Sequence, residues 1–379
     1  MGTIVVILGG GYAGVMAANR LAASGRPGLE VVLVTPARRF VERIRLHQYA
    51  AGTREDATVD FASVLHPAVS CVWDSAARIQ PEARRIQLST GNWLGYDYLV
   101  YSVGSAGAAA PEGAHRIEQL DGAAAARSDL AALPAGGRVA VVGGGLTAVE
   151  AAAETARAFP HLRVVLHSAG PVAPRLGAPA QRTLEQRLRK AGVELHTNRA
   201  AAADGDVRRS LDADVVLWCA GFAVPGLAAA SGLPVNAGGR LRLGPTLQVH
   251  GSERIYGAGD AAAIDGYSYL RMSCAAALPM GADAAGNILR AIDGTAGIRH
   301  NSGFRGVCIS LGRKDAVVQF LAADDTPSRL HLYGRTAAVQ KELICRMTLR
   351  WIRGEAKRSG AYTWPTGPQV TDPSVRAAG

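Results

Sequence analysis

Two glycine-rich turns, far apart in one chain, constrain the fold more than any other feature. The first reads Gly9-Gly10-Gly11-Tyr12-Ala13-Gly14 and the second reads Gly143-Gly144-Gly145-Leu146-Thr147-Ala148. Each turn follows an apolar, β-branched run and opens an alanine-rich segment typical of a helix. A strand, a glycine turn and a helix N-terminus together cradle a pyrophosphate, because the backbone approaches closely and the helix supplies free N–H groups. Two turns therefore predict two dinucleotides, with electron transfer between them.

The composition narrows the class of protein and the kind of partner. A chain of 379 residues exceeds one core of ordinary size, so we expect two or three domains. The apolar fraction of 48% and the charged fraction of 19% exclude a disordered chain. The net charge of +10 favours anionic partners such as phosphate cofactors, acidic proteins or an anionic membrane. Interleaved basic and aromatic residues are missing, so we expect no nucleic acid partner.

The five cysteines indicate the compartment. They are scattered and form no Cys-x-x-Cys, so we predict neither a redox pair of thioredoxin type nor a metal site. Reduced thiols fit a cytoplasmic protein. The chain starts directly with strand residues and contains no apolar run of about 18 residues, so we expect no signal peptide and no spanning helix.

The pattern along the chain repeats once. The first unit is predicted to have a strand at 3–8, a helix at 13–24 and a strand at 30–34, then irregular sequence at 36–52, meander strands at 71–73, 77–79 and 84–88, and a buried strand at 98–103. The second unit has strands at 138–142, 163–166 and 215–219 and helices at 147–159 and 180–191. The chain then returns to the first unit near 239–260, and the tail has strands at 306–311 and 316–321 followed by a helix.

This order predicts an α/β protein with two Rossmann-like dinucleotide-binding domains, the second inserted in the first. The first domain comprises residues 1–110 and 236–300, the second comprises residues 111–235, and residues 301–379 form a small C-terminal α+β domain.

Four signals in a fixed order carry a resemblance to a known family. They are Gly9-x-Gly11-x-x-Gly14, Tyr101-Ser102-Val103-Gly104-Ser105, Gly143-x-Gly145-x-x-Ala148 and Gly257-Ala258-Gly259-Asp260. This order resembles the flavoproteins with two dinucleotide-binding domains, the pyridine nucleotide–disulfide reductase superfamily. Without a Cys-x-x-Cys, the chain is most similar to the type II NADH dehydrogenases. The resemblance implies FAD on the first domain, NADH or NADPH on the second, and hydride transfer from the nicotinamide to the flavin.

The resemblance also implies site residues. FAD contacts fall on Gly9, Gly11, Tyr12, Ala13, Gly14, Thr35, Val103, Gly104, Gly259 and Asp260, and NAD(P)H contacts fall on Gly143, Gly145, Leu146, Thr147 and Gly221. Glu150 is expected near the nicotinamide, and Arg45 is expected beside the flavin, where its charge would stabilise a reduced anion. The alternatives are a helix cap for Asp260, a surface ion pair with Glu42 or Glu55 for Arg45, and a helix-terminus charge without chemistry for Glu150.

Three departures from the family pattern leave questions open. The acid expected about 20 residues after each turn is replaced by Thr35 and by Ser168. FAD is therefore expected to be held more weakly than usual, and the choice between NADH and NADPH stays open, with Arg175 favouring NADPH. The two glutamines of the family's quinone motif become Ala275 and Pro279, which puts a quinone substrate in doubt.

The C-terminal helix bears on the partner. Its apolar residues Val339, Leu343, Ile344, Met347 and Trp351 are predicted on one face, with basic residues around them. Such a helix is typical of an anchor on the cytoplasmic membrane surface, and the alternatives are packing on the flavin domain or a homodimer interface. The expected function is electron transfer to a quinone or another small acceptor. A reductase for a ferredoxin-like partner or a biosynthetic small molecule, and a non-enzymatic redox sensor, are the alternatives.

Overall fold

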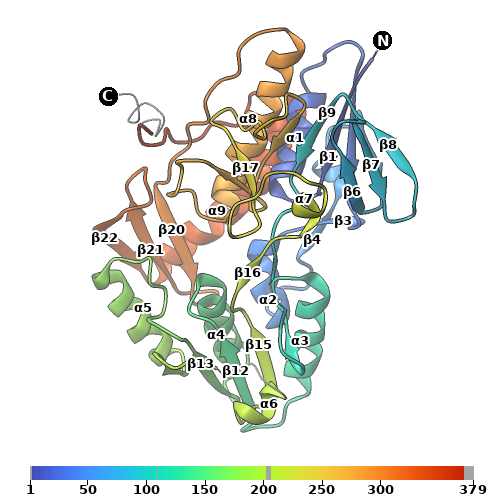
Figure 1. The fold of residues 1–379 in the computed structure, drawn as a ribbon. Helices are drawn as coiled ribbons and strands as arrows, with labels where there is room; N and C mark the ends of the chain where they lie inside the picture. The colour runs from blue at the N-terminus through green and yellow to red at the C-terminus, as the bar shows by residue number, and fades with distance from the viewer. Residues whose placement is uncertain (1, 108, 202–205, 371–379) are drawn as a thin grey trace.

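Two parallel sheets form the two lobes of the molecule (Figure 1). In the computed structural model, which describes residues 2–107, 109–201 and 206–370, their strand orders are β18-β9-β1-β2-β5 and β11-β15-β12-β13-β14. The first sheet consists of β1 (Thr3–Leu8), β2 (Leu29–Val34), β5 (Val69–Val72), β9 (Tyr98–Tyr101) and β18 (Ile255–Gly257), and the second of β11 (Ala114–His115), β12 (Arg138–Val142), β13 (Arg163–His167), β14 (Val193–His196) and β15 (Val215–Trp218). The predicted α/β class with two Rossmann-like sheets is confirmed. The exact domain boundaries stay a prediction, and residues 371–379 lie outside the described residues.

The helices follow the strands as the repeated pattern predicts. They are α1 (Tyr12–Ala22), α2 (Leu46–Ala50), α3 (Leu120–Ala132), α4 (Leu146–Ala158), α5 (Ala178–Lys190), α6 (Val207–Ser210), α7 (Leu227–Ala230), α8 (Cys274–Ile292) and α9 (Arg335–Lys357). In both units the second strand pairs in parallel with the first, and this pairing requires the intervening helix to cross over the sheet.

Helix α1 is enclosed within the first lobe, with most of its residues buried. It packs against α8 and α9, and a Cβ on Gly281 of α8 would collide with the carbonyl oxygen of Ala13. Only glycine permits this close helix crossing. At the end of α9, the fully buried Glu355 accepts hydrogen bonds from Arg20 Nε and from the backbone N–H groups of Gly360 and Tyr362. The C-terminal segment is therefore fixed to the N-terminal helix.

The segment 36–52 is not irregular, contrary to the prediction. It contains β3 (Arg39–Val41), a 3-10 turn at Arg43–Arg45 and α2, and β3 pairs with β4 (Thr58–Asp60). Helix α2 leaves the first lobe and packs against α3 and α4, and its Leu46 and Ala50 belong to the core of the second lobe. These contacts are distant in sequence, so local patterning did not show them.

Strand β5 was also misassigned, because it is the edge of the first parallel sheet and not part of a meander. Val69 to Val72 pair in parallel with Val31 to Val34. The meander itself is β6 (Ala76–Gln80), β7 (Arg85–Leu88) and β8 (Trp93–Gly95). Two further pairs of short strands are present. Strand β10 (Ala106–Gly107) pairs with β16 (Phe222–Ala223) in the segments that link the two lobes, and β17 (Leu241–Leu243) pairs with β19 (Ala262–Ile264) in the first lobe.

The C-terminal part is an antiparallel sheet of three strands with α9 against it. The strands are β20 (Gly306–Ser310), β21 (Ala316–Leu321) and β22 (Pro327–Tyr333), whereas two strands were predicted. Strand β22 was missed because all of its residues are exposed or half-buried, so its mixture of polar and apolar residues marks no core face. Figure 1 shows this sheet beside the junction of the two lobes.

The predicted single apolar face of α9 is divided in the structure. Val339 and Leu343 are 69% and 55% exposed, whereas Trp351 packs against Tyr362 with ring centroids 5.5 Å apart. The face that packs on the protein carries Ala337, Cys345, Thr348, Ile352 and Glu355. Packing on the first lobe is therefore confirmed for one part of the helix, whereas a membrane anchor or a dimer interface stays a prediction for the exposed part. No helix within the described ranges is long and apolar enough to cross a bilayer.

Candidate functional site

The two glycine turns have the same local geometry. Gly9 and Gly143 adopt φ of +105° and +141°, which L side chains rarely adopt. A Cβ on Gly9 would collide with Ser102 O, and a Cβ on Gly143 would lie 3.0 Å from Cys219 O. The second glycine of each Gly-x-Gly motif, Gly11 or Gly145, differs from the first. A Cβ on either of them would meet nothing within 4 Å. Each turn thus packs tightly at the first glycine of its motif and leaves open space at the second.

Each turn leads into a helix whose N-terminus carries no side-chain cap. Tyr12, Ala13 and Gly14 open α1 after Gly11, and Leu146 and Thr147 open α4 after Gly145. In both helices the N-cap glycine leaves the first backbone N–H groups without a side-chain acceptor. Such groups beside open space bind phosphate well, so both turns fit the pyrophosphate of a dinucleotide.

The rim of the first turn collects the other predicted FAD residues. Thr35 is buried at the end of β2, and its Oγ1 would lie 2.9 Å from a Cβ on Gly10. A Cβ on Gly259 would lie 3.1 Å from that of Ala13, so the segment with Asp260 adjoins the same helix start. Val103 and Gly104 follow β9, the neighbour of β1. The structure therefore brings these residues to one edge of the first sheet.

Asp260 caps no helix, so that alternative is wrong. The next element after it is the strand β19, and α8 begins only at Cys274 with Ser273 as its cap. Asp260 Oδ2 instead accepts a hydrogen bond of 2.8 Å from Ser105 Oγ. Arg43 Nη1 donates to the same hydroxyl at 3.2 Å, and sequence reasoning had not singled out Arg43.

Gly221 lies beyond the end of β15, at the carboxyl edge of the second sheet. This edge also contains the turn of Gly143 and Gly145, because β15 pairs with β12. The predicted NAD(P)H residues thus lie on neighbouring strand ends, which is where parallel sheets of this class bind ligands.

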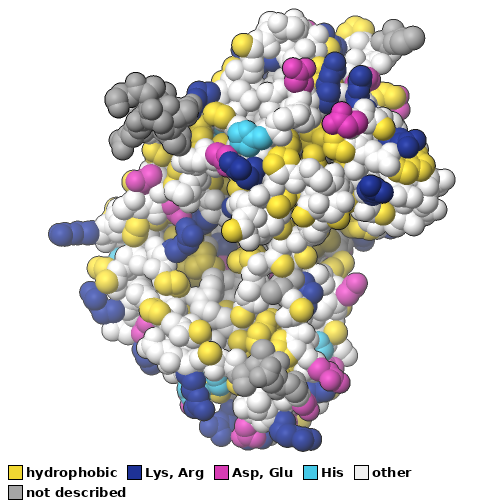
Figure 2. Space-filling model, in the orientation of Figure 1, with side chains coloured by type: hydrophobic (Ala, Val, Ile, Leu, Met, Phe, Trp, Pro, Cys, Tyr) yellow, Lys and Arg dark blue, Asp and Glu magenta, His cyan; other side chains and the backbone are white. Residues whose placement is uncertain are grey.

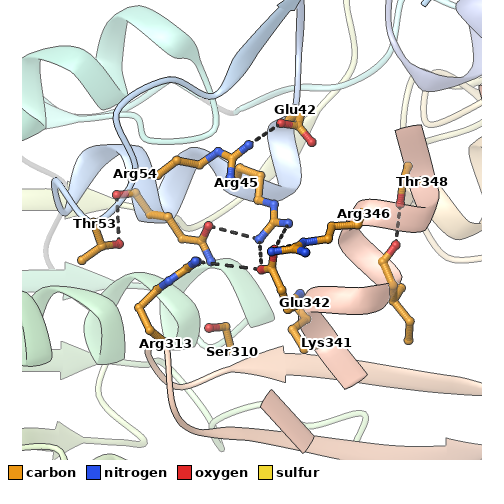
Figure 3. A network of polar contacts seen from close by, with 12 residues as sticks. Glu42, Arg45, Thr53, Arg54, Ser310, Arg313, Lys341, Glu342, Arg346 and Thr348 are labelled. Atoms are coloured by element: carbon orange, nitrogen blue, oxygen red, sulfur yellow. Dashed lines mark hydrogen bonds and ion pairs between the residues drawn. The ribbon is translucent and has the colours of Figure 1, made fainter. Parts of the chain in front are cut away.

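Arg45 is buried and paired with α9, so the alternative of a surface ion pair with Glu42 or Glu55 is wrong. Its guanidinium is 2.6 Å and 3.0 Å from the two carboxylate oxygens of Glu342, and Glu42 pairs with Arg54 instead (Figure 3). Burial alone would raise the pKa of Glu342, but hydrogen bonds from Arg45 and Arg346, with the charges of Arg45 and Arg313, lower it to about 2. This bidentate pair joins the first lobe to the C-terminal part.

Glu150 is the meeting point of three parts of the chain. It lies on α4 just past the first turn, so a charge within that first turn, at the helix terminus, does not describe it. Its Oε1 is 2.8 Å from Lys341 Nζ of α9 and accepts a 2.8 Å hydrogen bond from Ser310 N, while its Oε2 is 3.7 Å from His47 Nδ1 of α2. The second unit, the first unit and the C-terminal part therefore converge on one carboxylate.

The charges of this cluster are well defined. Burial alone would raise the pKa of Glu150, but Lys341 lowers it, so Glu150 is ionised. Burial alone would lower the pKa of Lys341, but Glu150 raises it, so Lys341 keeps its proton. Burial lowers the pKa of His47 to about 4, and the cations Lys341 and Arg45 act in the same direction. His47 is therefore neutral at neutral pH.

Several buried polar atoms around this cluster have no hydrogen-bond partner among the described residues. They are His47 Nε2, Arg45 Nε and Glu154 Oε2. Glu154, one turn beyond Glu150, accepts a hydrogen bond from Thr53, and burial raises its pKa. Unpartnered polar atoms are costly unless a ligand contacts them, so they fit a bound cofactor and substrate here.

Lys341 is the main residue that sequence reasoning missed. It had been placed among the basic residues around the apolar face of the C-terminal helix. A signal was present, because Ala337, Lys341, Cys345 and Thr348 recur at intervals of four, four and three residues. A lysine within such a stripe of small residues faces inward and needs a buried partner.

Comparisons with known proteins agree with this geometry. The family model for pyridine nucleotide-disulphide oxidoreductases matches residues 3–285. The chain is 32% identical over 321 residues to the NADH dehydrogenase-like protein MT1860 of Mycobacterium tuberculosis, covering 76% of this chain and 80% of that protein.

Two solved structures share the fold. The sulfide:quinone oxidoreductase of Aquifex aeolicus superposes with a TM-score of 0.80 at 20% identity, covering 94% of this chain and 92% of that one. NDH2 of Plasmodium falciparum, solved in complex with NADH, superposes with a TM-score of 0.75 at 16% identity, covering 96% of this chain and 99% of that one.

These findings confirm the resemblance inferred from the four sequence signals and the expectation of a flavoprotein oxidoreductase. With two uncapped glycine turns that fit two dinucleotides, the chain belongs to the pyridine nucleotide-disulphide oxidoreductase family, whose members are FAD-dependent enzymes that use NAD(P)H.

Proposed function

We propose that the protein passes electrons from NAD(P)H, through its flavin, to a quinone. One observation carries the choice of acceptor. Helix α9 presents Lys341 to Glu150 on its inner side, while Val339, Leu343 and Ile344 on the same helix are exposed. Because a helix with its side chains is about 10 Å across, an apolar acceptor on the outer side would be close to the charged cluster.

The chain's own residues bind and orient the reactants. The N-termini of α1 and α4 hold the two pyrophosphates, and the residues on the two sheet edges position the rings. A flavin held there would supply the capacity to accept a hydride and to release electrons singly or in pairs. Lys341 supplies a fixed positive charge in a buried setting, which stabilises negative charge that develops there. Glu150 holds Lys341 in place, and neutral His47 offers Nε2 to a ligand.

An exposed apolar strip supports contact with a membrane, where quinones dissolve. The strip comprises Leu330 and Leu332 of β22 and Val339, Leu343 and Ile344 of α9. Neighbouring cations include Arg346, whose side chain is mostly exposed. Exposed apolar side chains flanked by basic residues are typical of a surface that lies on an anionic bilayer.

An anaerobic absorbance titration tests the proposed reaction. NADH and NADPH are added in turn to the FAD-saturated protein, followed by a water-soluble quinone analogue. We expect bleaching of the flavin band and reoxidation by the quinone. Bleaching that a ferredoxin-like protein reverses, but the quinone does not, would favour the second candidate, a protein acceptor. That candidate is supported by Ala275 and Pro279, which replace the expected glutamines, and by the net charge of +10.

Flotation with anionic liposomes tests the membrane contact. The full chain is expected to float, and the double variant V339E/L343E is expected to stay in the soluble fraction. Phe222→Glu is the matched control, because Phe222 is equally exposed but lies away from α9 and β22. A full chain that never floats would contradict the membrane contact and leave the reaction itself untouched.

A further inference from the structure

The second turn unit lacks a carboxylate where a dinucleotide site that selects NADH has one. Ser168 occupies this position, directly after β13. It is 3% exposed, and a Cβ on Gly144 would collide with its Oγ. Ser168 therefore packs on the glycine turn itself, at the place where the adenosine ribose of a bound dinucleotide belongs.

Basic side chains surround this position. His167 directly precedes Ser168, and its ring meets the ring of His196 edge-on with centroids 5.0 Å apart, because β13 and β14 pair these two residues. The backbone N–H of Arg199 donates to Ser168 O at 3.1 Å, and the Arg199 side chain is exposed. Two imidazoles and an exposed arginine thus lie at the ends of neighbouring strands.

The electrostatics of the group favour an anion. Burial lowers the pKa of His167, and the charges of His196 and Arg199 lower it further, whereas Glu194 acts in the opposite direction. Glu194 lies two residues before His196 and pairs with it at 2.7 Å, so its charge is already engaged. A phosphate would relieve the repulsion among these basic groups. The lower end of the molecule in Figure 2, where Lys and Arg are mixed with Asp and Glu, is a different surface, because Figure 1 places α6 there and α6 precedes β15 at the opposite end of the sheet from Ser168.

We propose that His167, His196 and Arg199 bind a phosphate on the 2′ position of the adenosine ribose, so that the second unit selects NADPH over NADH. The inference rests on the proposed binding of NAD(P)H to this unit. The planar guanidinium of Arg199 suits a phosphate, and neutral Ser168 does not repel one as an acid would. Arg175, which the sequence had suggested for this role, instead lies 3.4 Å from Asp325, an acid that also pairs with Arg271.

Binding of two nucleotide fragments tests the proposal without any hydride transfer. Isothermal titration of the FAD-saturated protein compares 2′,5′-ADP with 5′-AMP, which differ only in the 2′-phosphate. We expect 2′,5′-ADP to bind at least tenfold more tightly. Arg199→Glu, at an exposed position, is expected to abolish this preference, and His167→Ala is expected to reduce it. Arg163→Ala is the matched control, because Arg163 lies on the same strand and face but about 13 Å away along β13.

Each other outcome would overturn the assignment. Equal affinity for the two fragments in the natural protein would show that no 2′-phosphate subsite exists. Loss of the preference in Arg163→Ala or Arg175→Ala, with Arg199→Glu unchanged, would place the subsite elsewhere. The proposed reaction fails in a different way: flavin that neither NADH nor NADPH bleaches would contradict hydride transfer, whatever the ratio of the fragment affinities.

Discussion

The first glycine turn leads into α1, which lies against both α8 and α9, whereas the second leads into α4 beside a sheet with one partly open face. Val139 and Val141 of β12 belong to the large core under the helices, but Ala140 and Val142 belong to a cluster of only four buried residues. On that open face a groove of about 220 Å³ is lined by residues such as Val165, His167 and His196. Two turns of the same geometry thus have different surroundings.

This difference teaches what a turn alone does not specify. The turn and the helix N-terminus determine that a pyrophosphate binds, and the surroundings determine whether the ligand stays. The enclosed first unit suits a cofactor that stays bound from one turnover to the next, although it dissociates slowly, and the open second unit suits a substrate that exchanges at each turnover. Glu150 and Lys341 lie where the two units meet, so a change in this ion pair is expected to affect both units.

The largest expected effect comes from breaking the junction between the units. Lys341→Met leaves Glu150 buried without its partner, so we expect the free energy of unfolding to fall by about 3–5 kcal/mol. Urea unfolding followed by circular dichroism measures this loss. Lys314→Met, at an exposed lysine, is the control and is expected to change little. The double variant K341M/E150Q should regain part of the loss, and a double variant less stable than K341M would contradict the pairing.

Substitutions at the second glycine of each Gly-x-Gly motif distinguish the ligands of the two units most directly. Gly11→Val and Gly145→Val fill open space, so both variants should fold. The first is expected to lose FAD, and the second to keep FAD while its affinity for NAD(P)H falls by about 100-fold, because a side chain blocks the approach of phosphate to backbone. Flavin absorbance and nucleotide titration measure the two losses. If both variants lost the same ligand, the assignment of one dinucleotide to each unit would be wrong.

His47 and His167 are expected to contribute differently to the pH dependence of folding stability. His47 is neutral in the folded protein with a pKa of about 4, whereas the unfolded chain takes up a proton below about pH 6.5. The unfolded state therefore binds more protons between pH 6.5 and 4, and stability falls as the pH falls through this range. We expect a contribution of about 2 kcal/mol between pH 6.5 and 5. His47→Asn should flatten the pH dependence of Tm more than His167→Asn does, and identical profiles would contradict this.

The smallest expected effect concerns the neutral residues that end the second strand of each unit. Thr35 offers a weaker acceptor than a carboxylate, so FAD should be lost on prolonged dialysis. Thr35→Asp is expected to lower the Kd for FAD by roughly fivefold, which corresponds to about 1 kcal/mol. The matched change Ser168→Asp should instead shift the second unit towards NADH. Stoichiometric flavin after extensive dialysis of the natural protein would contradict weak retention.

The local elements around each turn were predictable from the sequence. The strands β1 and β12 occur at the residues predicted, and α1 and α4 begin within one residue of the prediction. A β-branched run, a glycine turn and an alanine-rich segment determine these elements through short-range sterics, so neighbouring residues suffice to find them.

The contacts between distant segments were not predictable in the same way. Arg45 meets Glu342 across 297 residues of sequence, and Ser105 meets Asp260 across 155. Nothing near Arg45 in the sequence indicates its partner, and the nearby acids Glu42 and Glu55 suggested the wrong one. Pairing of buried charges depends on which helices pack together, and only the fold shows that.

The strand β18 has a consequence for how the chain folds during synthesis. It inserts beside β9 at the edge of the first sheet, although about 150 residues, including the whole second sheet, separate the two strands. The ribosome releases the chain from its N-terminus, so the residues of the second lobe emerge before β18, the last strand of the first sheet. Glu355, which binds Arg20 of α1, emerges later still. The lobe that begins the chain is therefore the last to finish, and its apolar surface depends on the nascent chain staying protected until then.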